Sequence, residues 1–338
     1  MGHAYQAVVF NRQKRLYDGV IAGTVLLYLV LFIGLGLSQY ESITAETLII
    51  RALSTAAFGL LHVILSIGPM ARIDDRFLPF LYNRRHLGVI MALLAVGHGV
   101  FALLQFHLFG AVNPLVSVLS TDGSFWSSLN GSGPFPFQPF GFFALLVIAV
   151  MAATSHDFWL SQLSAPVWKK LHMLVYFAYA LLVVHVVLGI GQESSTVWPL
   201  LFTSLGACWL VSIHLWAGIK SHKNDSEIHS EDRGGFVNAG PLLDIEDGRA
   251  ISLMIAGETV ALFREGQKAH AVSGICQHQN GPLAEGRIID GLITCPWHGY
   301  QYCPKSGKSP EPFSEHIPTF ETRLENGDVW VRTTVIPI

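Results

Sequence analysis

The sequence has little charge for its length. Only 13% of its 338 residues are Asp, Glu, Lys or Arg, about half the share in an average soluble domain. Apolar residues make up 51% of the chain and the mean hydropathy is +0.44, so we expect much of it to lie in a solvent other than water. The formal net charge is −3, which offers no basic surface and argues against a nucleic-acid partner.

Cysteine is also scarce, and two motifs are absent. Four cysteines are too few for a disulfide framework in a chain of this length. Cys276, Cys295 and Cys303 share one polar region, which favours a metal site, whereas Cys208 lies in an apolar run and is expected to pack as a small hydrophobic residue. No Cys-x-x-Cys-His occurs for covalent haem attachment, and no Gly-x-Gly-x-x-Gly for a dinucleotide.

Long apolar runs dominate the first two thirds of the chain. A bilayer core of about 30 Å needs about 20 helical residues, and open backbone groups have no partner in lipid, so the runs must be helices. The sequence predicts a cytoplasmic tail (residues 1–18), a six-helix membrane domain (19–219), a polar linker (220–234) and a small all-β domain (235–338). The six predicted spans are residues 19–38, 48–70, 87–109, 139–156, 171–191 and 197–219.

Basic residues predict the orientation of these spans. With six spans, nearly all Lys and Arg residues of the first 223 positions fall on one side, which the positive-inside rule makes cytoplasmic. Both termini and the β domain are then cytoplasmic, and the first span is an uncleaved anchor because no small-residue cleavage site follows it. The residues on this side are Arg12, Lys14, Arg15, Arg72, Arg76, Arg84, Arg85, Lys169, Lys170, Lys220 and Lys223. The opposite side carries loop 110–138, which is expected to be functional or disordered.

Histidines in the spans suggest metal ligands, because ionisable groups in lipid are costly and usually have partners. Imidazole is a common axial ligand of haem iron. The third and fifth predicted spans run parallel, which pairs His98 with His185 towards the outside and His86 with His172 towards the cytoplasm. The spacings of 12 and 13 residues turn about 120° and 220° around an ideal helix, so neither helix presents both histidines on one face. His62 and His214 stay open as alternatives, and His107 and His156 are expected at the interface.

Motifs in these spans resemble the ferric-reductase-like transmembrane family, which includes haem-b subunits of bacterial methionine-sulfoxide reductase systems and NADPH oxidases. The similarity lies in Trp168-Lys-Lys-Leu-His172 with Tyr176 and His185, in Arg84-Arg85-His86-Leu87-Gly88 leading to His98, and in Thr154-Ser155. It covers about residues 50–220. The resemblance implies that His98, His172 and His185 bind haem. His86 fits less well, because the bacterial members usually lack it and the oxidases space their histidines one residue further apart.

The C-terminal region reads as short strands around two ligand pairs. Hairpins are predicted at residues 250–263 and at the Asn326-Gly327 turn before 328–333. Cys276-x-His278 and Cys295-x-x-His298 are separated by 16 residues. Two thiolates and two imidazoles suit a [2Fe–2S] cluster with one iron bound by nitrogen, or a Cys₂His₂ zinc site. Gly281 and Gly299 would let the loops turn tightly.

Both loops closely resemble the Rieske family, through Cys276-Gln-His-Gln-Asn-Gly-Pro-Leu283 and Cys295-Pro-Trp-His-Gly-Tyr-Gln-Tyr302. The resemblance implies that Cys276, His278, Cys295 and His298 hold the cluster, and it argues against zinc. Respiratory members add a disulfide at the positions held here by Gly281 and Trp297, so this chain is closer to the ferredoxin-like branch. The resemblance also implies that Tyr302 bonds a ligand thiolate and tunes the potential. Cys303 is expected to be a packed or surface thiol.

Together these features predict an oxidoreductase component in a bacterial inner membrane. Electrons would pass between a cytoplasmic-side Rieske cluster and two b-type haems, and on to a quinone, ferric iron or an extracytoplasmic acceptor. A flavoprotein or ferredoxin reductase is the expected donor, and the direction could reverse. The alternatives are a redox sensor or assembly factor with the same cofactors and, less consistent with spans almost free of acidic residues, a transporter.

Overall fold

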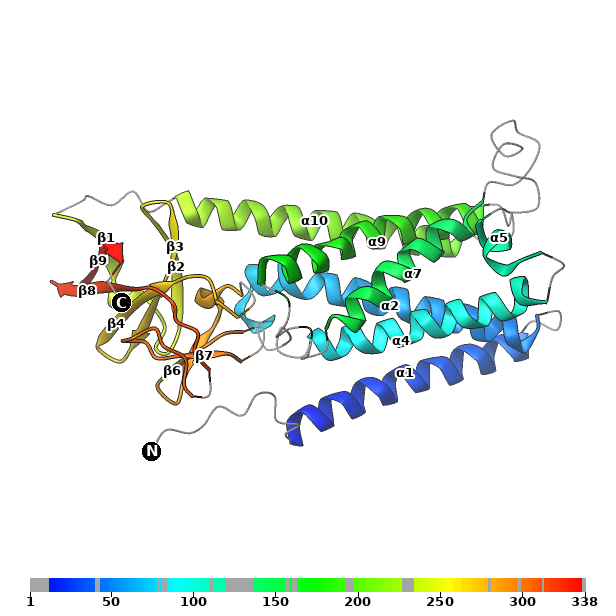
Figure 1. Ribbon diagram of the computed structural model, residues 1–338, viewed down its shortest axis with the longest axis horizontal. Helices are drawn as coiled ribbons and strands as arrows, with labels where there is room; N and C mark the ends of the chain where they lie inside the picture. The colour runs from blue at the N-terminus through cyan, green and yellow to red at the C-terminus, as the bar shows by residue number, and fades with distance from the viewer. Residues whose placement is uncertain are drawn as a thin grey trace.

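The computed structural model places a bundle of long helices beside a small β domain (Figure 1). It describes residues 12–39, 43–77, 80, 84–109, 112–119, 136–155, 159, 163, 165–191, 197–226, 234–278, 281–296, 299–311 and 313–335. The β domain lies at the end of the bundle where α1 begins, and α5 lies at the opposite end. His156, Trp297, His298 and most of loop 110–138 fall outside the described residues.

The helices follow the predicted spans closely. They are α1 (Arg12–Gln39), α2 (Ala45–Ile73), α4 (Arg84–Leu103), the short α5 (Pro114–Leu119), α7 (Gln138–Ala153), α9 (Ala165–Gly191) and α10 (Trp198–Ser226). A 3₁₀ turn, η1 (Asp75–Phe77), follows α2, and a π-helical turn, η2 (Leu104–Leu108), extends α4.

Within the described residues, five helices rather than six are long and apolar enough to cross a bilayer. The exception is α7, which has 16 residues and ends at Ala153 instead of continuing to residue 156. The hydroxyl of Thr154 donates to the carbonyl of Val150 at 2.8 Å, and that of Ser155 to Met151 at 2.8 Å. Such back-bonding competes with the helical ladder, which accounts for the early end.

Two pairings organise the bundle. The helix α2 packs against α1, α4 and α10, while α7 packs mainly against α9. Apolar side chains from α2, α4, α7, α9 and α10 form its core, and many leucines and valines stay exposed on the outer faces of the helices, as lipid contact requires. The fully or nearly buried members of this core are Ala57, Leu61, Leu65, Met91, Ala92, Leu94, Ala144, Ile148, Ala178 and Leu210.

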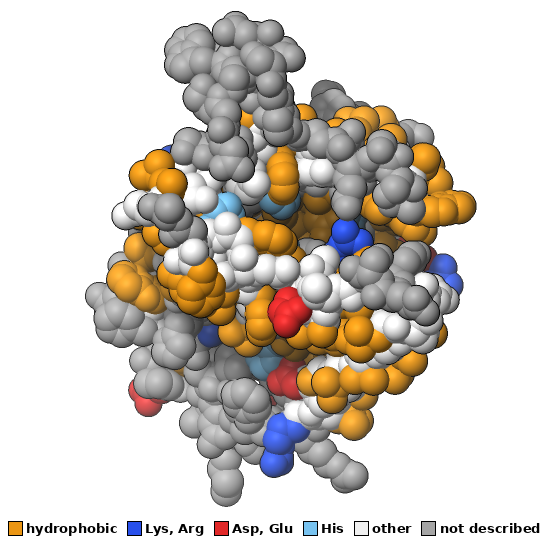
Figure 2. Space-filling model, turned by 90° about the vertical axis from the view of Figure 1, so that its right-hand side faces the viewer, with side chains coloured by type: hydrophobic (Ala, Val, Ile, Leu, Met, Phe, Trp, Pro, Cys, Tyr) orange, Lys and Arg blue, Asp and Glu red, His pale blue; other side chains and the backbone are white. Residues whose placement is uncertain are grey.

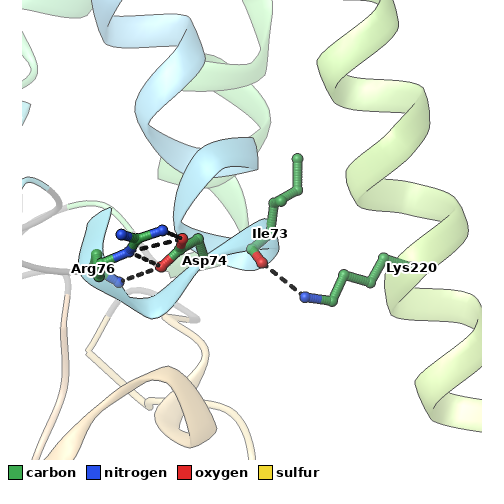
Figure 3. A network of polar contacts seen from close by, with 4 residues as sticks. All are labelled: Ile73, Asp74, Arg76 and Lys220. Carbon is green, nitrogen blue, oxygen red and sulfur yellow. Dashed lines mark hydrogen bonds and ion pairs between the residues drawn. The ribbon is translucent and has the colours of Figure 1, made fainter.

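The end of α2 that faces the β domain is held by a polar network (Figure 3). The Nζ of Lys220 on α10 donates to the carbonyl of Ile73 at 2.7 Å. The carboxylate of Asp74 accepts from the guanidinium and the backbone N–H of Arg76. Hydrogen bonds from the Arg76 side chain and backbone lower the pKa of Asp74 to about 2. This contact therefore persists in mild acid and weakens only as the pH falls towards 2.

The β domain contains two antiparallel sheets. In the larger sheet the order is β1-β9-β8-β4-β3-β2, and in the smaller one it is β5-β6-β7. The strands are β1 (Phe236–Pro241), β2 (Ala250–Ile255), β3 (Glu258–Glu265), β4 (Lys268–Ser273), β5 (Arg287–Ile289), β6 (Leu292–Thr294), β7 (Gln301–Tyr302), β8 (Thr319–Glu325) and β9 (Asp328–Val335). Two short 3₁₀ turns, η3 (Leu242–Asp244) and η4 (Leu283–Glu285), connect them.

Both predicted hairpins are present. The strands β2 and β3 pair around Ala256 and Gly257, whose φ angles are 50° and 82°. The strands β8 and β9 pair around Asn326 and Gly327, with φ angles of 53° and 91°. Two successive residues with positive φ form the turn whose twist matches that of antiparallel strands, so these local sequences set the register of both hairpins.

Candidate cluster and haem sites

The two predicted cluster loops have the same backbone closure. The N–H of Cys276 donates to the carbonyl of Gly281 at 2.9 Å, and the N–H of Cys295 donates to that of Tyr300 at 2.8 Å. Each loop thus begins at a cysteine and returns to it five residues later. Gly299 has a φ of 70°, a conformation that favours glycine. The loops begin after β4 and β6, so both sheets of the domain contribute one.

The two thiols are buried in one apolar cluster that includes Tyr300 and Tyr302. Cys276 and Cys295 are each 1% exposed, and both are free thiols. The ring of His278 stacks on that of Tyr300 with centroids 4.7 Å apart. The hydroxyl of Tyr300 in turn donates to the carboxylate of Glu315. Tyr300 directly precedes β7, and Glu315 lies in the loop after it, so these two residues fix the plane of the His278 imidazole.

Tyr302 connects the first loop to the smaller sheet. Its hydroxyl accepts the N–H of Gln277 at 3.0 Å and lies 3.3 Å from the sulfur of Cys276. Burial and the neighbouring Cys276 thiol raise the pKa of this phenol, so it stays protonated and can donate to the sulfur. Sequence reasoning predicts such a bond to a ligand thiolate. The structure supplies the geometry, and the tuning role stays a prediction.

The donor set fits a two-iron cluster. Soft thiolates and neutral imidazoles are the ligands that such a cluster requires, and Cys276, His278 and Cys295 supply three of them in two neighbouring loops. The fourth predicted ligand, His298, lies outside the described residues.

In the bundle, the predicted haem ligands His98 and His185 both contact backbone carbonyls. The Nδ1 of His98 on α4 is 3.1 Å from the carbonyl of Ile50, and the Nδ1 of His185 on α9 is 2.9 Å from that of Phe137. An imidazole that donates Nδ1–H to a carbonyl leaves Nε2 available to a metal. Both α4 and α9 also pack on α7.

A glycine on α7 makes room for His185. A Cβ at Gly141 would lie 2.7 Å from Cε1 and Nδ1 of the imidazole, closer than side-chain carbons approach in proteins. The absence of a side chain at this position therefore lets the ring of His185 lie directly on the backbone of α7. At the end of the molecule that faces the viewer in Figure 2, histidine side chains appear among hydrophobic ones.

The other predicted pair is arranged differently. The Nδ1 of His172 is 3.1 Å from the carbonyl of Trp168, and its Nε2 is 3.2 Å from the hydroxyl of Ser155. The Nδ1 of His86 is 2.8 Å from the carboxylate of Asp18 on α1. His86 and His98 thus contact different helices, as their 120° separation on α4 predicts. Ligation by His86 and His172 stays a prediction.

His62 and His214 are paired with tyrosines of α9. The Nε2 of His62 accepts from the hydroxyl of Tyr179 at 3.0 Å, and that of His214 from Tyr176 at 3.0 Å. The Nδ1 atoms of both imidazoles contact carbonyls one turn back on their own helices. Sequence reasoning misses these partners, because three helices, α2, α9 and α10, supply them from distant positions in the chain. His107 is buried beside Ser117, with Nδ1 at 2.8 Å from the hydroxyl.

Comparison with known families divides the chain in the same way. The model for "Ferric reductase like transmembrane component" matches residues 53–183. The model for "Rieske [2Fe-2S] domain" matches residues 236–321. The first match includes α4, α7 and the part of α9 that carries His172. The second includes both cluster loops and Tyr302.

Individual relatives match the β domain. The 3-phenylpropionate/cinnamic acid dioxygenase ferredoxin subunit of Escherichia coli (strain K12) is 29% identical over 97 residues, which are 28% of this chain and 91% of the relative. Apoptosis-inducing factor 3 of Homo sapiens is 27% identical over 92 residues, 27% of this chain and 15% of that protein. Among solved structures, the ferredoxin of carbazole 1,9a-dioxygenase from Nocardioides aromaticivorans IC177 has a TM-score of 0.28 and 20% identity, covering 29% of this chain and 98% of its own.

These matches assign the helical bundle and the β domain each to a type of domain. The Rieske domain supports a [2Fe–2S] cluster, and the apolar helices make the chain an integral membrane protein that serves in electron transfer. The chain joins a ferric reductase-like transmembrane domain to a Rieske [2Fe–2S] domain.

Proposed function

We propose that this chain conducts electrons across a bacterial inner membrane between its Rieske domain and the far end of the bundle. The single observation that carries the proposal is the fusion of the two domains, with the Rieske domain at the end of the bundle where α2 ends and α4 begins (Figure 1). The positive-inside rule makes this end cytoplasmic. Both chain termini are then cytoplasmic as well.

A Rieske cluster and two b-type haems, when bound, would supply the one-electron chemistry. On the protein side, Cys276 and Cys295 hold buried thiolates for one iron, and His278 and His298 supply imidazoles for the other. In the bundle, His98 and His185 are proposed ligands of one haem, and each has its Nδ1 held by a backbone carbonyl. His172 and His86 are the proposed ligands nearer the Rieske domain. Tyr302 adjusts the electron affinity of the cluster through its contact with Cys276.

The partners follow from this arrangement. The relatives that match the Rieske domain include proteins named as ferredoxin subunits, which supports a carrier of single electrons. A cytoplasmic flavoprotein or ferredoxin reductase is the proposed donor. A quinone, ferric iron or an extracytoplasmic protein is the proposed acceptor, and quinol could drive the reverse direction.

Spectroscopy of the full-length protein tests the proposal. We expect a Rieske electron paramagnetic resonance (EPR) signal and low-spin b-haem bands in the same preparation, with haem reduction by a cytoplasmic reductant that depends on the cluster. A preparation without haem absorbance, after expression with adequate haem, would contradict the conduit. Both cofactors without electron exchange between them would instead indicate a redox sensor.

A further inference from the structure

An ion pair connects the Rieske domain to the bundle. The Oε1 of Glu285 lies 3.7 Å from the Nε of Arg72. Arg72 is in the last turn of α2, and Glu285 ends η4, the 3₁₀ turn that begins directly after the loop of Cys276 and His278. The contact therefore attaches the immediate neighbour of a cluster loop to the membrane domain.

Arg84 at the start of α4 adds a second positive charge to this contact. Its guanidinium lies against Gly68 of α2, one turn before Arg72, where a Cβ would approach Nη1 to 3.3 Å. The start of α4 thus places a second cation beside the end of α2 that Glu285 contacts.

On the membrane side of this contact, hydrogen bonds hold the end of α2 in place. Beyond Arg72, the end of α2 is held by the bond from Lys220 to Ile73 and by the pairing of Asp74 with Arg76 (Figure 3). Lys220 belongs to α10, the helix that leads towards the Rieske domain in sequence. The domain is therefore connected to the bundle by the chain beyond α10, by the contact of β2 with α10 and by Glu285.

We propose that Glu285, with Arg72 and Arg84, forms the docking contact that positions the first cluster loop on the bundle. These three are positioning residues, since none is a predicted ligand. The inference rests on the proposed function, because docking matters for the rate only if electrons cross this interface. Arg72 and Arg84 are among the basic residues that predict the orientation of the membrane domain. They would thus have a second role, the electrostatic attraction of the Glu285 carboxylate.

The solvent exposure of the two side chains determines the expected strength of the ion pair. The Arg72 side chain is 55% exposed and that of Glu285 is 24% exposed, so screening limits the attraction. We expect Glu285→Gln to slow electron exchange between the domains about two- to fivefold. Glu285→Arg places like charges together and should slow it roughly tenfold or more, with a smaller difference at high salt.

The kinetic test uses full-length protein in lipid nanodiscs. Haem reduction is followed after rapid reduction of the cluster, in wild type, Glu285→Arg, Arg72→Glu and the double variant with exchanged charges. We expect each single variant to be slow and the double variant to recover, with cluster and haem potentials unchanged throughout. Glu325→Arg, the same charge change at an exposed position next to the β8–β9 turn, is the control and should match wild type.

A second measurement needs no electron transfer. In a Cys208→Ser, Cys303→Ser background, Arg72→Cys and Glu285→Cys are treated with a short bis-maleimide, and the cross-linked peptides are identified by mass spectrometry. A high yield supports docking even if haem reduction fails, in which case only the conduit is wrong. A yield no higher than for Arg72→Cys with Glu325→Cys, or equal rates for wild type and Glu285→Arg, would overturn the docking contact.

Discussion

At the scale of single residues, the hydroxyl of Tyr302 has two contacts with the first cluster loop. It accepts from Gln277 and lies 3.3 Å from the sulfur of Cys276. A donor to a ligand sulfur stabilises the reduced state, in which the sulfur carries more negative charge. We expect Tyr302→Phe to lower the cluster potential by about 30–60 mV, which is up to a tenfold change in the reduction equilibrium. An EPR-monitored redox titration measures the shift.

A neighbouring tyrosine provides the matched control. Tyr300→Phe keeps the ring that stacks on His278 and removes the hydroxyl that donates to Glu315, a residue that is not a predicted cluster ligand. Its effect on the potential should therefore be clearly smaller than that of Tyr302→Phe. Equal potentials for wild type and Tyr302→Phe would mean that the hydroxyl serves only Gln277.

The histidines of the bundle give a second prediction at this scale. If His98 and His185 hold one iron, then His98→Ala and His185→Ala should each remove the same low-spin haem, because bis-imidazole ligation needs both. His172→Ala should remove the other haem and leave the first. Optical spectra and haem quantification of purified variants distinguish these results. Loss of different haems in His98→Ala and His185→Ala would contradict their pairing.

His86 differs from the other proposed haem ligands because its Nδ1 contacts a carboxylate, that of Asp18, whereas theirs contact backbone carbonyls. A carboxylate on Nδ1 can support a metal ligand by raising its basicity. We therefore expect His86→Ala to make the second haem high-spin or to remove it. An unchanged spectrum would show that His172 holds this iron with another group or alone, and would leave the His86–Asp18 pair as a structural contact between α1 and α4.

At the scale of helices, the contact of α7 with His185 depends on Gly141. We expect Gly141→Ala to displace the imidazole, since its Cβ would lie 2.7 Å from the ring. Binding of the haem at His98 and His185 should fall, which the haem-to-protein ratio measures. Gly59→Ala, within the long helix α2, is the control, because a Cβ there meets no atom within 4 Å. Equal haem content in the two variants would contradict the role of Gly141.

The bond between Lys220 and the carbonyl of Ile73 gives a prediction about α2. A cation at a helix C-terminus stabilises it by about 0.3–1 kcal/mol. Lys220→Met should therefore lower the thermal midpoint by roughly 1–4 °C in detergent, with haem spectra unchanged. Lys220→Arg retains the donor and the charge and should stay near wild type. A midpoint for Lys220→Met equal to that of wild type would show that water replaces this bond.

Helices and hairpins were predictable where the signal is local. Apolar runs located the long spans to within a few residues, and the Asn326-Gly327 turn located β8 and β9. The short α7 was not predicted, because hydropathy does not register the bonds of Thr154 and Ser155 to their own helix. The π-helical end of α4 has no marker in the periodicity either.

At the scale of the whole molecule, the two cofactor sites lie in separate domains. Cys295 is in the β domain, in an apolar cluster distinct from that of the bundle. We expect Cys295→Ser to abolish the Rieske EPR signal and to leave haem absorbance intact. Loss of both signals from protein that is still inserted and monodisperse would contradict two independently folded domains.

Contacts between distant parts of the chain were beyond prediction from the sequence. The spacing of cysteines and histidines indicates the cluster, because its ligands lie in two short segments. The partners of His62, His214 and His86 come from helices separated by dozens of residues. Arg72 and Glu285 are more than two hundred positions apart, and a charged residue at a helix end does not reveal its partner.

The length of α7 has a consequence for the membrane itself. Sixteen residues at 1.5 Å each give a rod of about 24 Å, whereas a typical hydrocarbon core is about 30 Å thick. Lipids beside α7 must thin to meet it, or polar residues at its ends must reach outwards. His185 bonds to Phe137, the residue just before this helix. Where the lipids thin at the start of α7, the insulating layer between the imidazole of His185 and water becomes shorter.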